Sequence, residues 1–323
     1  MFNIKIMLKK IKSIKKIFPL LKQSYIAFTD DRGLKLSAAL AYYTIFSIAP
    51  LLIVLIAVTG IFYGQEAVQG KIFSQLNDFI GNKSAAQVQD ILKQMQLSGK
   101  GTFAIITGII TLIIGASGVF IEIQDSINLI WRVKAKPKRG WVKLIVDRVL
   151  SLSMIASLGF LLIVSLIING IVLAMCSILT RFLPDITLII IQILNQGITL
   201  LVLVALFSII YKILPDVDIK WKDVIAGALF TSILFMLGKY LIGLYIESSS
   251  IASVYGAAGS FLLIIVWVYY SAAILYFGAE FTQVYAHSYG GKIKPSKYAV
   301  YIEQTIIEKE VAYLPTQKPI NPT

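Results

Sequence analysis

Blocks of 20 or more apolar residues, almost free of charged side chains, recur six times along the 323-residue chain. A stretch of this length, wound as an α-helix, crosses a bilayer hydrocarbon core of about 30 Å. The pattern therefore predicts an all-α integral membrane protein with six transmembrane helices. The predicted spans are 37–62, 103–130, 149–174, 186–211, 224–246 and 261–285.

Two segments outside these blocks have the spacing of amphipathic helices. In residues 1–35, Ile4, Met7, Leu8 and Ile11 recur at helical intervals among lysines. This pattern predicts a basic interfacial helix, held by its apolar face and by anionic lipid headgroups. The spacing of apolar residues in 63–102 predicts an amphipathic helical hairpin on the outer side.

The chain is thus divided into a cytoplasmic interfacial helix (1–35), a membrane domain (36–286) and a cytoplasmic tail (287–323). The tail contains several prolines and is expected to be partly disordered.

Lysine and arginine are distributed unevenly among the segments that flank the blocks. Residues 1–36, 131–148, 212–223 and the tail hold 24 of the 30 basic residues, whereas 63–102, 175–185 and 247–260 hold five. Lys239, inside a block, is the remaining one. Because short basic loops stay in the cytoplasm during insertion, this alternation predicts that both termini are cytoplasmic, in a bacterial cell membrane.

Composition narrows the classes of function. The chain is 57% hydrophobic and carries a net charge of +13, which the topology explains without a nucleic-acid partner. The single cysteine and single histidine exclude the common zinc arrangements, and no phosphate-binding loop or nucleophile elbow is present. We therefore expect no metal, no cofactor and no enzymatic activity.

Four ionisable residues lie within the predicted spans, where charge is costly and usually has a role or a partner. From the helical rise, Glu122, Asp125 and Glu280 fall in one layer near the cytoplasmic interface, level with Arg132. This layer is interpreted either as an acidic mouth that binds a cation or gates through an ion pair, or as charge pairing that anchors helix ends.

Lys239 falls in the outer third of the core, at the depth of Asn195 and Gln196 on the preceding span. Two interpretations remain open. Lys239 either faces Asn195 and Gln196 inside the bundle or extends outward to lipid headgroups.

Special residues mark two further candidate regions. Pro50 interrupts the first span, one or two turns after three polar side chains. This arrangement suits a hinge or a polar-lined cavity, but proline is also an ordinary residue of membrane helices. A loop without basic residues precedes the last span and is a candidate outer mouth. The residues concerned are Tyr42, Tyr43 and Ser47 in the first region, and Tyr255, Gly256, Gly259 and Ser260 in the second.

Several of these motifs together resemble the YihY/BrkB family of bacterial inner-membrane proteins. They are the run from Leu36 to Leu52, the Leu214-Pro215-Asp216-Val217 segment with Trp221 and Gly227, and the run Tyr255 to Ser260 followed by Trp267 and Gly278-Ala279-Glu280. The resemblance covers about residues 32–285 and implies six helices in the cytoplasmic membrane. It maps the family motifs onto Tyr42, Tyr43, Ser47, Pro50, Asp216, Gly256, Gly259, Trp267 and Glu280.

The resemblance leaves the activity open. Members have been labelled as a transfer-RNA processing nuclease or as serum-resistance factors, and movement of lipid or lipopolysaccharide precursors has been proposed. The nuclease label fits this chain poorly, because the chain offers no metal-ligand set. The leading hypothesis is a transporter or flippase-like protein for a lipid or other amphiphile, and the alternative is a non-catalytic membrane scaffold or assembly partner in envelope biogenesis.

Overall fold

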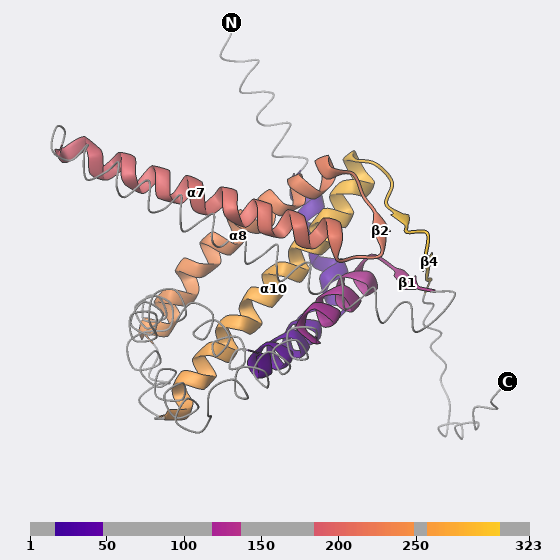
Figure 1. The fold of residues 1–323 in the computed structure, drawn as a ribbon, viewed down its shortest axis with the longest axis horizontal. Coiled ribbons are helices and arrows are strands. Elements are labelled where there is room, and N and C mark those ends of the chain that lie inside the picture. The colour runs from indigo at the N-terminus through magenta and orange to yellow at the C-terminus, as the bar shows by residue number, and fades with distance from the viewer. Residues whose placement is uncertain (1–16, 48–117, 137–183, 249–256, 304–323) are drawn as a thin grey trace, which may run out of the picture.

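The computed structural model describes residues 17–47, 118–136, 184–248 and 257–303 (Figure 1). Within these ranges, the side chains of residues 184–192, 246–248 and 257–261 are not described. The predicted outer hairpin (63–102), the third span (149–174), the first residues of the interfacial helix and the last residues of the tail lie outside the described residues.

Three long helices dominate the described part of the chain. They are α7 (Pro184–Ile213), α8 (Trp221–Ser248) and α10 (Ala257–Tyr289). Each contains a stretch long and apolar enough to cross a membrane, namely Ile193–Ile213, Trp221–Tyr245 and Leu262–Tyr289. These stretches confirm the last three predicted blocks as long apolar helices. The total of six spans and their orientation remain predictions.

Local sequence signals explain where these helices begin and end. Pro184 opens α7, where its missing N–H costs nothing, and Pro215 follows the helix shortly after its end. Lys212 in the last turn of α7 and Asp223 in the first turn of α8 each complement the helix dipole. The short connection between Ile213 and Trp221 therefore ends α7 and begins α8.

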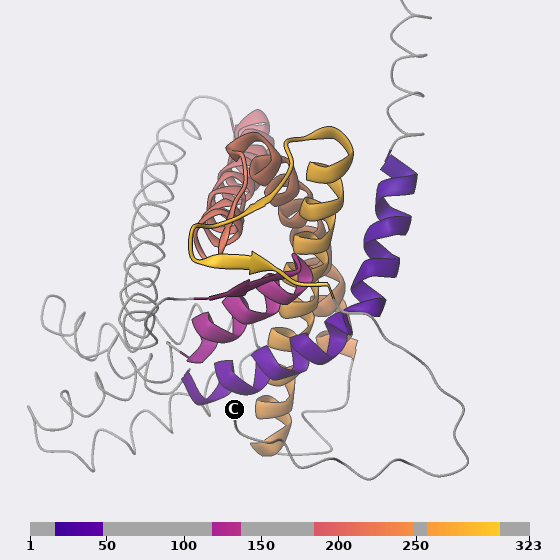
Figure 2. The same ribbon diagram turned by 90° about the vertical axis from the view of Figure 1, so that its right-hand side faces the viewer.

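Shorter helical segments cover residues 17–30, 33–47 and 118–130. The first two meet at a bend (Figure 2), and Arg32 lies in that bend with φ of 55°. Arg132 follows segment 118–130 with φ of 57°. A left-handed conformation costs a non-glycine residue roughly 1–2 kcal/mol, so tertiary contacts must hold both arginines in place.

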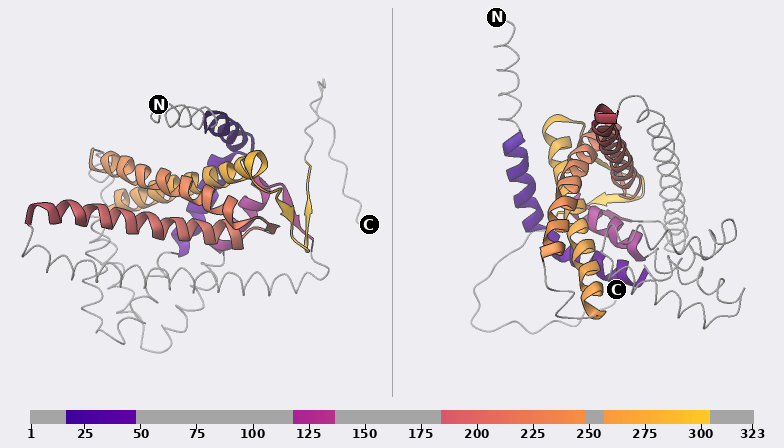
Figure 3. Two further views of the ribbon diagram at one scale, coloured as in Figure 1. Left: turned by 90° about the horizontal axis from the view of Figure 1, so that it is seen from above. Right: turned by 90° about the vertical axis from the view of Figure 1, so that its left-hand side faces the viewer.

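Helix α8 packs against both α7 and α10. Seen in Figure 1, α7 and α8 lie close together near the strands and separate toward their other ends. The view from above in Figure 3 shows the same three helices running alongside one another. We call the end next to the strands the strand end.

Four short strands lie at the strand end. Strand β1 (Val133–Ala135) pairs antiparallel with β4 (Ala299–Tyr301), and β2 (Val217–Asp218) pairs antiparallel with β3 (Lys294–Pro295). The all-α prediction did not include them, because their partners are far apart in the sequence. Residues 287–303 of the tail are ordered, and the strands join them to two connections between helices.

The buried core also lies toward the strand end. Side chains of segment 118–130, α7, α8 and α10 form one cluster there. Fully buried members include Ile127, Tyr211, Val224 and Tyr276. By contrast, large apolar side chains such as Leu201 and Leu241 are exposed along α7 and α8, as expected for helices that face lipid.

Candidate functional site at the strand end of the helices

Glu280 is a fully buried acid on α10. Neither oxygen of its carboxyl group accepts a hydrogen bond from a donor in the part of the chain described here. Nearly all buried polar groups in proteins are paired, and an unpaired one in a membrane helix is usually functional. Glu280 is therefore the first residue of the candidate site.

Asp31 is the acidic neighbour of Glu280. The two side chains lie within hydrogen-bonding range of each other, although each is an acceptor when ionised. Arg132 Nη2 donates to Asp31 Oδ1 at 2.6 Å, and the side chain of Asp31 is only 5% exposed. Burial raises the pKa of Asp31 above its ordinary value, and Arg132 opposes that rise without cancelling it. We name Asp31, Arg132 and Glu280 the acid–arginine cluster.

Three separate elements supply this cluster, and backbone contacts fix their positions. Trp131 Nε1 donates to the carbonyl of Ala279 at 3.0 Å, which places the residue before Arg132 against the residue before Glu280. Ile302 N–H donates to the carbonyl of Arg132 at 2.8 Å, so the residue after β4 also holds this turn. Segment 118–130, α10 and the bend after residue 30 therefore meet at one point.

A cavity of about 370 Å³ opens beside Arg132. Its lining combines charged and amide side chains with apolar ones. The lining residues are Asp125, Asn128, Leu129, Arg132, Val133, Lys134, Ala135 and Ile302. Arg132 thus contacts Asp31 and also forms part of the cavity wall.

Asn128 and Asp216 form a reciprocal pair next to this cavity. Asn128 Nδ2 donates to Asp216 Oδ2 at 2.9 Å, and the backbone N–H of Asp216 donates to Asn128 Oδ1 at 2.8 Å. The N–H of Ser296 donates to the carbonyl of Asp216 at 2.9 Å. Asp216, which the family resemblance singled out, therefore connects segment 118–130, the α7–α8 connection and the tail.

Small and hydroxyl residues form the interface of the three long helices. Tyr211 OH donates to the carbonyl of Leu275 at 2.7 Å and lies 3.1 Å from Thr231 Oγ1. Gly278 leaves the space that these two side chains fill. Hydroxyl hydrogen bonds and close packing thus join α7, α8 and α10.

The other predicted site residues lie apart from the acid–arginine cluster. Glu122 is half-buried, and its Oε1 accepts a hydrogen bond from Ser126 Oγ at 3.3 Å. Tyr42 and Tyr43 are exposed on segment 33–47. Ser47 is buried and donates to the carbonyl of Tyr43 at 3.0 Å, the usual i−4 bond of a helical serine.

On the other helices, Gln196 on α7 and Lys239 on α8 are exposed. Asn195 is half-buried, and its side-chain oxygen has no hydrogen-bond partner among the described residues. Whether Lys239 faces Asn195 remains a prediction.

At the candidate outer mouth, Gly259 and Ser260 lie in the first turn of α10. Tyr255 and Gly256, like Pro50 in the first span, lie outside the described residues. Within the described ranges, no three His, Cys, Asp or Glu side chains gather as a metal site.

Asp31 is the site residue that the sequence did not reveal. It lies before the first apolar block, so the search for charges inside the spans did not include it. Its neighbours Arg32 and Lys35 are close in sequence, whereas its contacts, Arg132 and Glu280, come from distant elements. Two consecutive aspartates at the edge of an apolar block were the only available signal.

We predict that Asn128→Asp lowers the free energy of unfolding by about 1–3 kcal/mol, because it sets a carboxylate against Asp216 and removes a donor. Thermal unfolding of the full chain in detergent measures this loss.

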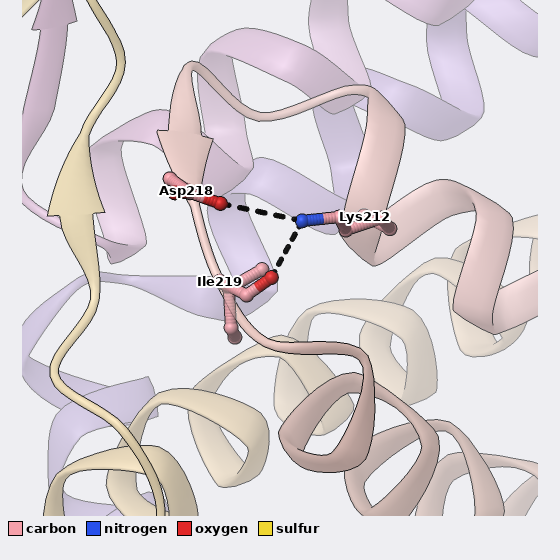
Figure 4. A network of polar contacts seen from close by, with 3 residues as sticks. All are labelled: Lys212, Asp218 and Ile219. Atoms are coloured by element: carbon pink, nitrogen blue, oxygen red, sulfur yellow. Dashed lines mark hydrogen bonds and ion pairs between the residues drawn. The ribbon is translucent and has the colours of Figure 1, made fainter.

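The matched control is Asp218→Asn. Lys212 Nζ lies 3.4 Å from Asp218 Oδ1 and donates to the carbonyl of Ile219 at 2.6 Å. Figure 4 shows these two contacts side by side. Asp218 is 81% exposed, so the control should change stability by less than about 1 kcal/mol. Equal losses in both variants would contradict the structural role of the Asn128–Asp216 pair.

Long apolar helices that carry a buried acidic site define this protein as a helical membrane protein. The sequence profile of the family described as Virulence factor BrkB matches residues 24–301, so the chain belongs to this family. This result confirms the resemblance drawn from the motifs.

Curated relatives agree with that assignment. The chain is 29% identical over 265 residues to a UPF0761 membrane protein of Azotobacter vinelandii, covering 78% of this chain and 60% of the relative. It is 28% identical over 257 residues to a UPF0761 membrane protein of Pseudoalteromonas translucida, covering 78% and 81% respectively. The chain thus spans about three fifths of the length of the first relative. No solved structure matches the chain.

Proposed function

We propose that this protein is a transporter or flippase-like protein that moves a lipid or another amphiphile. The observation that carries the proposal is the cavity beside Arg132, whose wall combines charged side chains with apolar ones such as Leu129 and Val133. A charged headgroup fits such a lining, because Arg132, Lys134 and Asp125 offer partners of both signs.

The exposed apolar surface of the long helices supports an amphiphilic substrate rather than a fully polar one. Leu201 on α7 and Leu241 on α8 are among many large apolar side chains directed away from the protein interior. An acyl chain can remain against this surface, in lipid, while the headgroup occupies the polar cavity. Protein groups rather than hydrocarbon then surround the charged headgroup, which lowers the free-energy cost of moving it.

We place the protein in the bacterial cell membrane, with both termini in the cytoplasm and the cavity at the cytoplasmic side. The basic flanks support this orientation, and anionic headgroups are the expected lipid partners of the basic N-terminal helix, residues 1–35. We propose a non-catalytic role, without a cofactor and without a nucleic-acid partner. The buried acid at Glu280 supports an ion or substrate pathway.

The cavity is tested by filling it. We predict that Leu129→Trp lowers the rate at which purified protein moves fluorescent anionic or zwitterionic lipid analogues across proteoliposome membranes. A loss of about tenfold is expected, equivalent to about 1.4 kcal/mol of lost binding or barrier lowering. Leu241→Trp, a similar change on an exposed position of α8, is the matched control and should retain the wild-type rate. Equal rates in the two variants would exclude the cavity as the headgroup path.

Wild-type protein that moves no lipid analogue would favour the alternative function, a scaffold or assembly partner. Phe18 and Tyr25 are exposed on segment 17–30 and offer an apolar surface for a partner. Deletion of residues 1–24 should then abolish complex formation while the long helices still insert into the membrane.

A further inference from the structure

The surroundings of Glu280 leave its carboxylate without a donor. The side chain is fully buried, and both oxygens are without a hydrogen-bond partner among the described residues. An ionised carboxylate in such a position needs a cation or several donors. Among the residues that the structure describes, the cation that acts on Glu280 is Arg132, and its guanidinium group is already bonded to Asp31 at 2.6 Å.

The charges around Glu280 come from two other elements. Asp30 and Asp31 belong to the end of segment 17–30 and its bend, and Arg132 follows segment 118–130. Helix α8 meets α10 on a different side, through Gly227 against Thr282, and adds no ionised group to these. With both cluster acids ionised, Arg132 would therefore balance only one of them.

A single proton resolves this imbalance. If one carboxyl group holds a proton, its O–H donates to the other carboxylate, and the cluster then carries one negative and one positive charge. We infer that Asp31 and Glu280 together form a proton-binding site, with Arg132 holding the remaining negative charge. We further infer that this proton is exchanged during substrate movement, a step that rests on the proposed transport function.

The geometry favours a proton over a metal ion as the occupant. Hard cations require several oxygen ligands, whereas no three acidic side chains among the described residues gather closely enough to hold a metal ion, and a guanidinium group is bonded to Asp31. A bound cation would lie close to this positive charge. The cavity beside Arg132 is not lined by Glu280, so the space it offers does not reach the buried acid.

The cavity and the acid–arginine cluster share one residue, Arg132. Arg132 lines the cavity with a side chain that is 35% exposed, and its Nη2 contacts the buried Asp31. The acid–arginine cluster is therefore joined to the cavity through Arg132, whose position depends on the charge of Asp31. Removing the proton would place two like charges between α10 and the bend after residue 30, and this repulsion favours a different packing of these elements.

The first test measures proton binding without transport. Infrared difference spectra of the full chain in detergent, recorded between acidic and alkaline pH, should show loss of a protonated carboxyl C=O band. Glu280→Gln, which mimics a protonated carboxyl group, should abolish this band. Asp31→Asn should change the pH at which the band is lost. Asp218→Asn, an exposed acid, should leave it unchanged.

The thermal unfolding temperature gives a second readout. In the wild type it should fall by a few degrees for each pH unit above the ordinary range of a carboxylic acid, because the unfolded state has released there a proton that the folded state still binds. Glu280→Gln should lose most of this dependence. Identical band and unfolding profiles in wild type and Glu280→Gln would overturn the proton-binding site.

Lipid flux separates this inference from the proposed function. In proteoliposomes with an imposed pH gradient, the wild-type rate should depend on the gradient, whereas the rate of Glu280→Gln should not. Absence of flux in the wild type, together with the infrared band, would remove the transport function and leave the proton site standing. Wild-type flux that ignores the gradient would overturn the coupling step.

Discussion

Alanine at position 278 is expected to destabilise the protein by about 1–3 kcal/mol, because its Cβ would overlap two buried side chains. Those side chains are Thr231 on α8 and Tyr211 on α7. Their hydroxyl groups lie 3.1 Å apart, and Tyr211 also donates to the carbonyl of Leu275. Relief of the overlap requires a shift of α10 from its neighbours or the loss of these hydrogen bonds. Thermal unfolding in detergent measures the effect.

Gly243 provides the matched control for this substitution. It also lies within a long helix, but no atom in the described part of the chain lies within 4 Å of a Cβ added there. Gly243→Ala should therefore cause no loss, and the better helix propensity of alanine should add up to about 1 kcal/mol of stability. Equal unfolding temperatures for Gly278→Ala and Gly243→Ala would show that the three helices do not meet as closely as described.

Removal of the positive charge at Arg132 is expected to cost about 2 kcal/mol. This loss lies between the losses expected on removing one partner of an exposed and of a buried ion pair, because Arg132 is 35% exposed and Asp31 is 5% exposed. Arg132→Gln leaves Asp31 beside Glu280 with no cation, so ionisation of Asp31 becomes less favourable. Arg132→Lys keeps a charge without the planar fork and should lose less.

The loss in Arg132→Gln should depend on pH in a defined direction. Burial already raises the pKa of Asp31, and loss of the arginine raises that pKa further. A group whose pKa is raised on folding stabilises the protein fully below its unfolded pKa, and this contribution is lost as the pH rises through the folded pKa. The variant should thus be close to wild type in acid and least stable at neutral pH.

The double variant Asp31→Asn with Arg132→Gln completes the test. It removes both charges of the pair, so it should recover part of the stability lost in Arg132→Gln at neutral pH. A double variant as unstable at neutral pH as the sum of the single losses would show that the two side chains do not interact. Asp218→Asn, at the 81% exposed end of the Lys212–Asp218 pair, is the control and should change little.

The sequence predicted those features that depend on local pattern. Uninterrupted apolar blocks were sufficient to locate α7, α8 and α10, because helix formation in a bilayer follows from length and hydropathy alone. Glu280 was identified for a related reason, since an acid within an apolar block is rare enough to be noticed. Both inferences required no knowledge of tertiary contacts.

Features that depend on distant contacts could not be predicted in the same way. Asp31 becomes part of the site only because a bend places it beside α10, and Asp216 acquires its role from Asn128, 88 residues earlier. The short strands have no periodicity of their own, and they exist because β1 and β2 meet the tail. Local sequence carries little information about such pairings.

The pairing of the tail with earlier connections has a consequence for biosynthesis. Residues 294–301 leave the ribosome after every helix described here, yet β1 and β2 have no strand partners until these residues arrive. Inserted helices must therefore wait, with the edge groups of β1 and β2 still bonded to water, until translation has passed Tyr301. Closure of the strand end is a late and long-range folding step, and chains that stall before it should be preferred targets of membrane proteases.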